Sequence, residues 1–179
     1  DMSPTGRTGV LNHASFLMAT AGATSETHPV LRGKVIANRF MCASIAPPPP
    51  NVNTTVDSAL LPANPTPKET LAVHTKSASC FACHKVLDPY GLALETFDPF
   101  GKPRLVYSAI ASRPIDQTGI LPSGESFSST SQFMQVIKGH TQLKSCLAQS
   151  VLSLSLTRPA TNNDDLCLAK QMSASVLQS

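Results

Sequence analysis

One short stretch, Cys80-Phe81-Ala82-Cys83-His84, constrains this chain more than any other part of the sequence. Two cysteines three residues apart, followed at once by histidine, form the attachment signature of a c-type haem. Each thiol adds across one vinyl group of the porphyrin, and on a helical turn the next residue directs its imidazole at the iron. We therefore predict Cys80 and Cys83 as the covalent anchors of one haem c and His84 as its proximal iron ligand.

The same motif has two other interpretations, half of a zinc site and a thioredoxin-like redox pair. A zinc site needs a second ligand pair at short spacing, and neither Cys146 nor Cys167 has one. A redox Cys-x-x-Cys pair usually lies beside a βαβ pattern, which is not evident in this sequence. Haem attachment is therefore the favoured interpretation.

Length and composition favour a single exported domain with an extension. A chain of 179 residues is long enough for one buried core. The net charge of +3 is too small to indicate nucleic-acid binding, and no apolar run reaches membrane-spanning length. The chain opens with Asp1-Met2-Ser3-Pro4, which we interpret as a trimmed end after signal cleavage. Thioether attachment occurs on the oxidising side of bacterial membranes, so we expect a periplasmic or extracellular location.

Three further cysteines remain after the haem motif. Cys146 falls on the apolar face of one predicted helix and Cys167 near the start of the next, so we predict a disulfide that closes this helical hairpin. The alternative is that both are small buried apolar residues. Cys42 is then left over, either buried or bonded to something outside the chain.

Residues 1–65 are predicted to form an N-terminal arm with one good helix and a polyproline segment. A short helix is expected near residues 15–20. The main helix begins at Pro29, capped by Thr27 or His28. Its predicted apolar face comprises Val30, Leu31, Val35, Ile36 and Phe40, and it ends before the four prolines at 47–50.

Residues 66–179 are predicted to form the monohaem cytochrome c domain. Thr66 and Glu69 form a capping box around Pro67 at a helix start. The haem-motif helix is expected to end at Asp88-Pro89, because a residue before proline avoids the helical region. Short β runs with turn residues over 105–128 indicate a small hairpin, followed by helices near 129–139, 142–156 and 164–177. The predicted class is mainly α, a cytochrome c-like helical haem domain with a small β-hairpin insertion and an N-terminal Pro-rich arm.

Several stretches, taken together, resemble a known family. The most specific is Asp88-Pro89-Tyr90-Gly91-Leu92-Ala93-Leu94-Glu95-Thr96-Phe97-Asp98, with Gly101 and Arg104 after it. The others are Leu31-Arg32-Gly33-Lys34, the proline run before Asn51, His74-Thr75, Ile115-Asp116 with Gly119, and Leu121-Pro122-Ser123-Gly124. From about Gly9 to Cys167 the chain resembles the C-terminal portion of large secreted cytochrome proteins of planctomycetes and myxobacteria. In that portion two domains of unknown function surround one Cys-x-x-Cys-His. The resemblance implies a periplasmic or surface monohaem module, usually the tail of a longer polypeptide, and implies no particular reaction.

The second axial ligand of the iron decides between electron transfer and chemistry at an open position. His74 is the first candidate, because it lies six residues before Cys80 and the family has a counterpart of it. The alternative for His74 is a surface or capping role. Met134 is the second, although ordinary core packing is the favoured interpretation of Met134 taken alone. The remaining candidates are His13, His28, His140, Met18, Met41 and Met172. We interpret His28 as a helix cap and His140 as a residue at a helix end that interacts with its carbonyl groups.

Three acidic residues, Glu95, Asp98 and Asp88, are candidates for a Ca²⁺ or proton-relay cluster. The favoured interpretation is structural, with these residues capping turns or pairing with Arg104 or Lys102.

The expected function is to pass single electrons between redox partners, or between subunits of a cytochrome complex, without nucleic-acid binding or a membrane span. Two alternatives are a peroxidase-like haem enzyme with an open coordination site and a structural subunit of a multi-cytochrome assembly.

Overall fold

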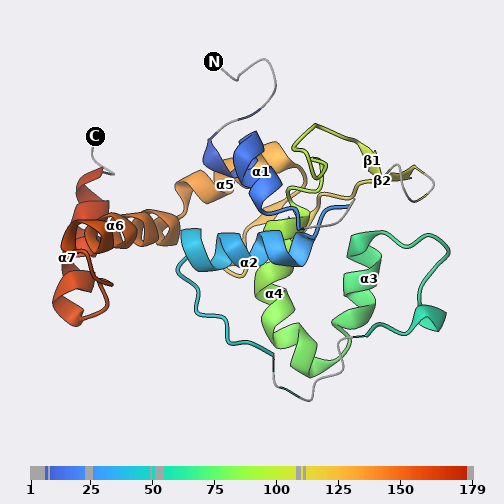
Figure 1. The fold of residues 1–179 in the computed structure, drawn as a ribbon, viewed down its shortest axis with the longest axis horizontal. Helices are drawn as coiled ribbons and strands as arrows, with labels where there is room; N and C mark the ends of the chain where they lie inside the picture. Colours follow the sequence, from blue (N-terminus) through green and yellow to red (C-terminus); the bar gives the residue numbers. More distant parts are fainter. Residues whose placement is uncertain are drawn as a thin grey trace.

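The fold is mainly α-helical, with two short antiparallel strand pairs between the fourth and fifth α-helices (Figure 1). The computed structural model describes residues 7, 9–22, 26–48, 50, 55–107, 110 and 112–176. The predicted fold class, mainly α with a small hairpin element, is confirmed. In chain order the helices are η2 (Val10–Asn12), α1 (Ala14–Ala19), α2 (Pro29–Phe40), η3 (Ser58–Leu60), α3 (Pro67–His74), α4 (Ala78–Leu92), α5 (Thr130–Gly139), α6 (Thr141–Leu156) and α7 (Asn163–Val176).

Two of the predicted helix starts are confirmed by their caps. The ring of His28 accepts a hydrogen bond from the Leu31 N–H at 3.2 Å, and Pro29 opens α2. At the start of α3 the Glu69 N–H donates to Thr66 Oγ1 at 3.2 Å, and the Thr66 N–H donates to Glu69 Oε2 at 2.8 Å. This capping box satisfies two amide groups that the helix itself leaves unpaired.

Helix α2 lies across α4, and glycines let the two backbones touch (Figure 1). A Cβ at Gly33 would lie well under 3.0 Å from the Leu87 carbonyl oxygen, and a Cβ at Gly91 equally close to that of Pro29. The buried face of α2 is therefore a stripe of Pro29, Arg32, Gly33, Ile36 and Ala37, spaced three and four residues apart. The predicted apolar face of α2 was wrong in part. Leu31 is exposed, and Arg32 lies on the buried face of the helix.

The predicted end of the haem-motif helix at Asp88-Pro89 is wrong. Helix α4 runs through Pro89 to Leu92. Proline lacks the N–H that would bond to the carbonyl of Lys85, but Lys85 is exposed, so water can satisfy that carbonyl. Burial of Tyr90, Gly91 and Leu92 against the core outweighs the local preference for an extended residue before proline.

The predicted hairpin region forms two separate strand pairs. Strand β1 (Val106–Tyr107) pairs with β2 (Arg113–Pro114), and β3 (Gly119–Ile120) pairs with β4 (Ser126–Phe127), both antiparallel. Each strand is only two residues long, so few hydrogen bonds join the strands of a pair. The burial of Tyr107 and Phe127 therefore stabilises the two pairs more than those hydrogen bonds do.

One hydrophobic core collects side chains from α1, α2, α4 and α5, including Leu17, Ile36, Leu87 and Phe133. Segments on both sides of residue 65 thus contribute to it, and the predicted division into an arm and a domain stays a prediction. Helices α6 and α7 form a hairpin on the far side of the molecule from α3, with its own small cluster around Leu152 (Figure 1). The predicted end of the last helix at Leu177 lies outside the described residues. No helix in the described part of the chain has the length and apolar character needed to cross a membrane.

The predicted disulfide between Cys146 and Cys167 is wrong, because Cys146 bonds to Cys42. Cys42 follows α2 with a left-handed backbone (φ 47°), which turns the chain back toward the buried Cys146 on α6. The two Cα atoms lie 5.4 Å apart, within the ordinary disulfide range. Cys167 is exposed on α7 with a free thiol.

Candidate functional site

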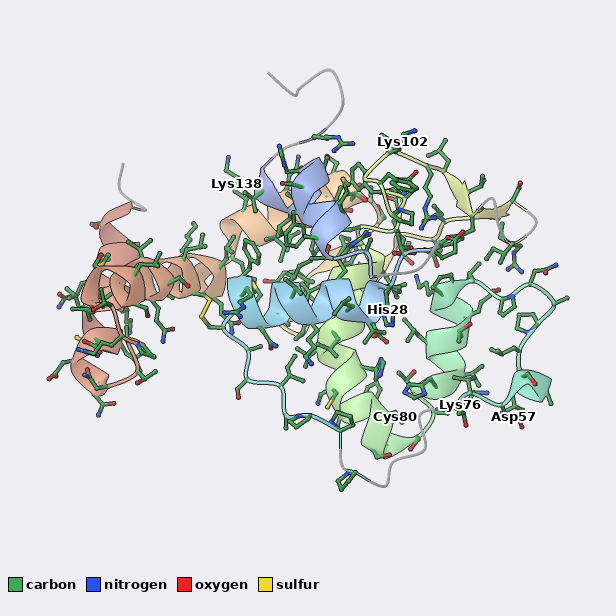
Figure 2. The ribbon with its side chains drawn as sticks, in the orientation of Figure 1. His28, Asp57, Lys76, Cys80, Lys102 and Lys138 are labelled. Atoms are coloured by element: carbon green, nitrogen blue, oxygen red, sulfur yellow. A yellow bond between two sulfur atoms is a disulfide. The ribbon has the colours of Figure 1, made fainter. Side chains whose placement is uncertain are left out.

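The Cys-x-x-Cys-His motif lies in the N-terminal half of α4, away from the end that packs on α2 (Figure 2 labels Cys80). Cys80, Cys83 and His84 follow each other at helical spacings of three and four residues, so they occupy one face of the helix. Cys80 is buried and Cys83 half-buried, and both carry free thiols. The sequence prediction that these three residues lie on a helical turn is met.

The imidazole of His84 is held by a carboxylate one turn further along α4. His84 Nδ1 lies 2.8 Å from Asp88 Oδ1, and only 15% and 13% of the two side chains is exposed. Burial raises the pKa of Asp88, and the hydrogen bond from His84 offsets part of that shift. Because Nδ1 is engaged, Nε2 is the ring nitrogen that remains for a metal.

His74, the predicted second ligand, lies opposite His84 at the C-terminal end of α3. The two ring centroids are 4.7 Å apart, and the ring planes meet at 71°. Burial lowers the pKa of His74, and the neighbouring His84 lowers it further. A neutral imidazole is the form that binds a metal.

This set of donors fits a c-type haem. It supplies two free thiols at the motif spacing and two imidazoles that approach from different helices. The two rings contact each other, so they would have to separate before both could hold one metal. None of the side chains of α3 is buried, so little packing opposes that movement.

Two exposed polar contacts fix the N-terminal end of α3. Lys68 Nζ lies 2.6 Å from Asp116 Oδ2 and also donates to Thr118. Arg113 Nη2 lies 2.6 Å from Glu69 Oε1. The helix that carries His74 is thus attached at its start to the strand region and leaves its end beside α4.

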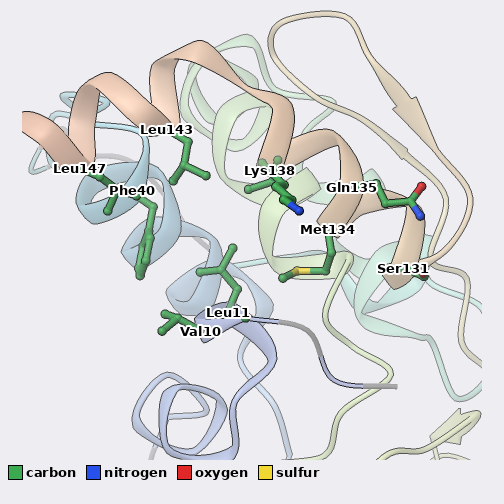
Figure 3. Close-up of a pocket in the computed structure, with 11 residues that line it drawn as sticks. Val10, Leu11, Phe40, Ser131, Met134, Gln135, Lys138, Leu143 and Leu147 are labelled. Atoms are coloured by element: carbon green, nitrogen blue, oxygen red, sulfur yellow. The ribbon is translucent and has the colours of Figure 1, made fainter. Parts of the chain in front are cut away.

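Met134, the second candidate ligand, lies elsewhere. It points into an apolar cavity of about 560 Å³ between η2, α2, α5 and α6, with Leu11, Phe40, Leu143 and Lys138 around it (Figure 3). This placement supports the core-packing interpretation of Met134.

The other candidate ligands have structural surroundings of their own. His13 and His28 cap α1 and α2. His140 was predicted to interact with helix carbonyl groups, but its Nδ1 instead accepts the Gln142 N–H and so caps the start of α6. Among the methionines, Met18 is exposed, Met41 is in the main core and Met172 packs against the α6–α7 cluster.

The three acidic residues do not form one cluster. Asp98 accepts hydrogen bonds from the Phe100 and Lys102 N–H groups at 2.9 and 2.7 Å and so caps a turn. Glu95 pairs with Arg104, while Asp88 pairs with His84. The predicted structural roles are confirmed for Asp98 and Glu95, whereas Asp88 pairs with His84 and not with Arg104 or Lys102. Among the described residues, no three His, Cys, Asp or Glu side chains are grouped so that they can hold a metal ion.

Sequence reasoning missed a buried charge cluster formed by Arg32, Glu95 and Arg104. Arg32 Nη1 lies 3.6 Å from Glu95 Oε1, and neither side chain is exposed. Thr27 Oγ1 donates to Glu95 Oε2 at 2.7 Å, and Arg104 Nη2 reaches the same oxygen at 3.3 Å. Burial raises the pKa of Glu95, and the two guanidinium groups oppose that shift. The signal in the sequence for this cluster was Arg32, which lies on the same helical stripe as Gly33 and Ile36.

Comparison with known proteins identifies one family. The model of PSCyt3, a protein of unknown function (DUF1588), matches residues 7–107. This domain is found in planctomycete cytochrome-like proteins. The match spans α1 to β1 and includes the Cys-x-x-Cys-His motif, His74 and the buried charge cluster. No curated protein and no solved structure matches the chain.

Proposed function

The chain belongs to the PSCyt3 family of proteins of unknown function, and from this premise we propose that it is a monohaem c-type cytochrome module that passes single electrons between redox partners. The observation that carries the proposal is the placement of Cys80, Cys83 and His84 on one face of α4, opposite His74 on α3. We place the module in the periplasm or outside the cell, as part of a larger protein or complex.

The haem iron would supply a ferric–ferrous couple for one electron. Cys80 and Cys83 would hold the porphyrin by adding sulfur and hydrogen across its two vinyl groups, a step that needs no oxidant. His84, through Nε2, and His74 are the residues that would hold the iron. Leu71 lies one turn before His74 on the same face of α3 and is half-buried, so its side chain would pack on the porphyrin and become buried there.

The disulfide supports the proposed location. Cys42 and Cys146 join segments 104 residues apart in the chain. Such bonds persist in oxidising compartments and are rare in the cytosol of most organisms, so the bond favours export.

The decisive experiment for the cofactor is a pyridine haemochrome assay on protein expressed with a c-type maturation system. We expect one haem per chain that stays with the polypeptide through denaturation and acidified organic solvent. The variant Cys80→Ala/Cys83→Ala should lose it, while Cys167→Ala, which removes an exposed thiol far from α4, should keep it. Pigment that leaves the wild-type chain would overturn the proposal.

The variant His74→Ala tests the electron-transfer role. With two histidine ligands the wild-type ferrous spectrum should be low-spin and CO should bind slowly, whereas the variant should become high-spin and bind CO readily. A wild type that is already high-spin and binds CO would instead support the enzyme alternative with an open position.

A further inference from the structure

The hydrogen bond between His84 and Asp88 has a consequence for the iron, and this inference rests on the proposed haem attachment. We propose that Asp88 is a positioning residue that holds the proximal imidazole in one orientation and lowers the reduction potential of the haem. Nothing in the Cys-x-x-Cys-His motif itself requires an acid at this position.

Helix geometry sets this contact. Cys80, His84 and Asp88 are spaced at four-residue intervals, so they lie one above the other along α4. Asp88 Oδ1 lies 2.8 Å from His84 Nδ1, the ordinary distance for an N–H···O bond to a carboxylate. The bond therefore fixes both the tautomer and the rotation of the ring about its Cβ–Cγ bond.

The surroundings make the contact specific to the histidine. About seven-eighths of each side chain is withdrawn from solvent, so water competes weakly for the carboxylate. In the described part of the chain no lysine or arginine forms an ion pair with Asp88, and its hydrogen-bond partner is the His84 ring. A carboxyl group withdrawn from solvent, with no lysine or arginine to pair with, therefore acts mainly on the proximal imidazole.

That charge has a defined effect on a bound iron. A carboxylate that accepts the Nδ1–H makes the imidazole a stronger electron donor through Nε2. A stronger donor stabilises the ferric state over the ferrous state, so the potential falls. Loss of such a hydrogen-bond partner of a metal-bound histidine typically changes metal affinity or activity by about 10–100-fold.

The test is the reduction potential of the holoprotein with Asp88→Asn. We expect the ferrous-to-ferric ratio at a fixed applied potential to rise about tenfold, which for one electron is a shift of about 59 mV to more positive values. Asp88→Glu, which keeps the charge, should restore most of the wild-type potential. Asp164→Asn, which removes a charge from the exposed first turn of α7, should leave the potential unchanged.

The outcomes separate this inference from the proposed function. A wild type without covalent haem ends both. Covalent haem in every variant with equal potentials for wild type and Asp88→Asn overturns the inference alone. If Asp88→Asn and Asp88→Ser both fail to retain haem, the Asp88→Glu variant distinguishes a positioning role of Asp88 from a packing role. Haem retention in the glutamate variant supports the positioning role, and haem loss there assigns Asp88 to packing and overturns it.

Discussion

At the scale of single residues, the interior of the molecule holds a pair of opposite charges. Arg32 and Glu95 are fully buried, and their side chains approach to 3.6 Å. Burying a charge away from water costs free energy unless an opposite charge lies beside it. Removing one member of the pair would therefore leave the other buried without that partner. The cluster thereby joins α2 to the segment after α4.

Replacing Arg32 by methionine should therefore lower the free energy of unfolding by about 3–5 kcal/mol, because Glu95 would lose one of its two cationic partners in the interior. Urea unfolding followed by circular dichroism measures this change. Arg39→Met on the exposed side of the same helix is the matched control and should change stability by less than about 0.5 kcal/mol. Equal effects of the two variants would contradict a stabilising role for the buried pair.

At the scale of elements, α4 has two functions along its length. Its first half carries the proposed haem ligands, and its second half packs on α2 through Gly91 and Gly33. The close approach leaves no room for a side chain at either glycine, because the opposing atoms are backbone carbonyls that cannot rotate away. The position of the proposed haem site relative to the core thus depends on this crossing.

The variant Gly91→Ala should lower the free energy of unfolding by about 3 kcal/mol or more, because its Cβ would overlap the Pro29 carbonyl. A midpoint shift in urea unfolding reports the loss. Gly139→Ala on α5 is the control, since its Cβ would meet no atom within 4 Å and should change stability by less than about 1 kcal/mol. A stable Gly91→Ala variant would mean that the two helices can separate without cost.

Helix α3 depends on exposed charges in place of a buried face. Burial alone would raise the pKa of Asp116, but its hydrogen bonds with Lys68 and Thr118 lower it to about 2. A carboxyl whose folded-state pKa lies below its unfolded value stabilises the fold above that unfolded value, and this contribution is lost as the pH falls through the folded-state pKa.

We accordingly expect Asp116→Asn to reduce the free energy of unfolding by at most about 1 kcal/mol at pH 6, since the pair is exposed to solvent. The difference from wild type should fade as the pH falls from about 4 toward 2. Urea titrations at pH 6, 4 and 2 measure it, with Asp164→Asn as a control at each pH. A difference that grows in acid would be contrary to this sign.

Features that depend on residues close together in the sequence could be predicted, and features that depend on residues far apart could not. The capping box at Thr66 and the proline start at Pro29 depend on residues within one turn, and both were predicted. The continuation of α4 through Pro89 depends on packing against α2, more than fifty positions away in the sequence, so the local proline rule failed. The haem-motif face could be predicted because it needs only helical spacing. The Asp88 contact uses the same spacing but was not recognised, since the predicted helix ended there.

At the scale of the whole molecule, one covalent bond connects the N-terminal part to the helical hairpin. The Cys42–Cys146 disulfide closes a loop with a sequence separation of 104 residues and links the end of α2 to α6. Its pairing could not be predicted from the sequence, because three cysteines were available outside the haem motif and only the turn at Cys42 selects the partner.

Removing this bond with Cys42→Ser/Cys146→Ser should lower the free energy of unfolding by about 2–4 kcal/mol, since the unfolded chain gains the freedom that a long closed loop denies it. Thermal unfolding by calorimetry measures the loss. Cys167→Ser, which alters an exposed thiol, should behave as wild type. An unchanged transition in the double variant would show that α6 is held by packing alone.

The disulfide also sets two opposite requirements for maturation of the same polypeptide. Cys42 and Cys146 must be oxidised to reach the observed fold, whereas thioether formation at Cys80 and Cys83 requires both sulfurs to stay reduced until the porphyrin arrives. A cell that makes the proposed holoprotein must therefore protect one pair of thiols from the oxidant that joins the other pair. Oxidation of the motif cysteines to each other before haem delivery would leave a correctly cross-linked chain that can no longer acquire its cofactor.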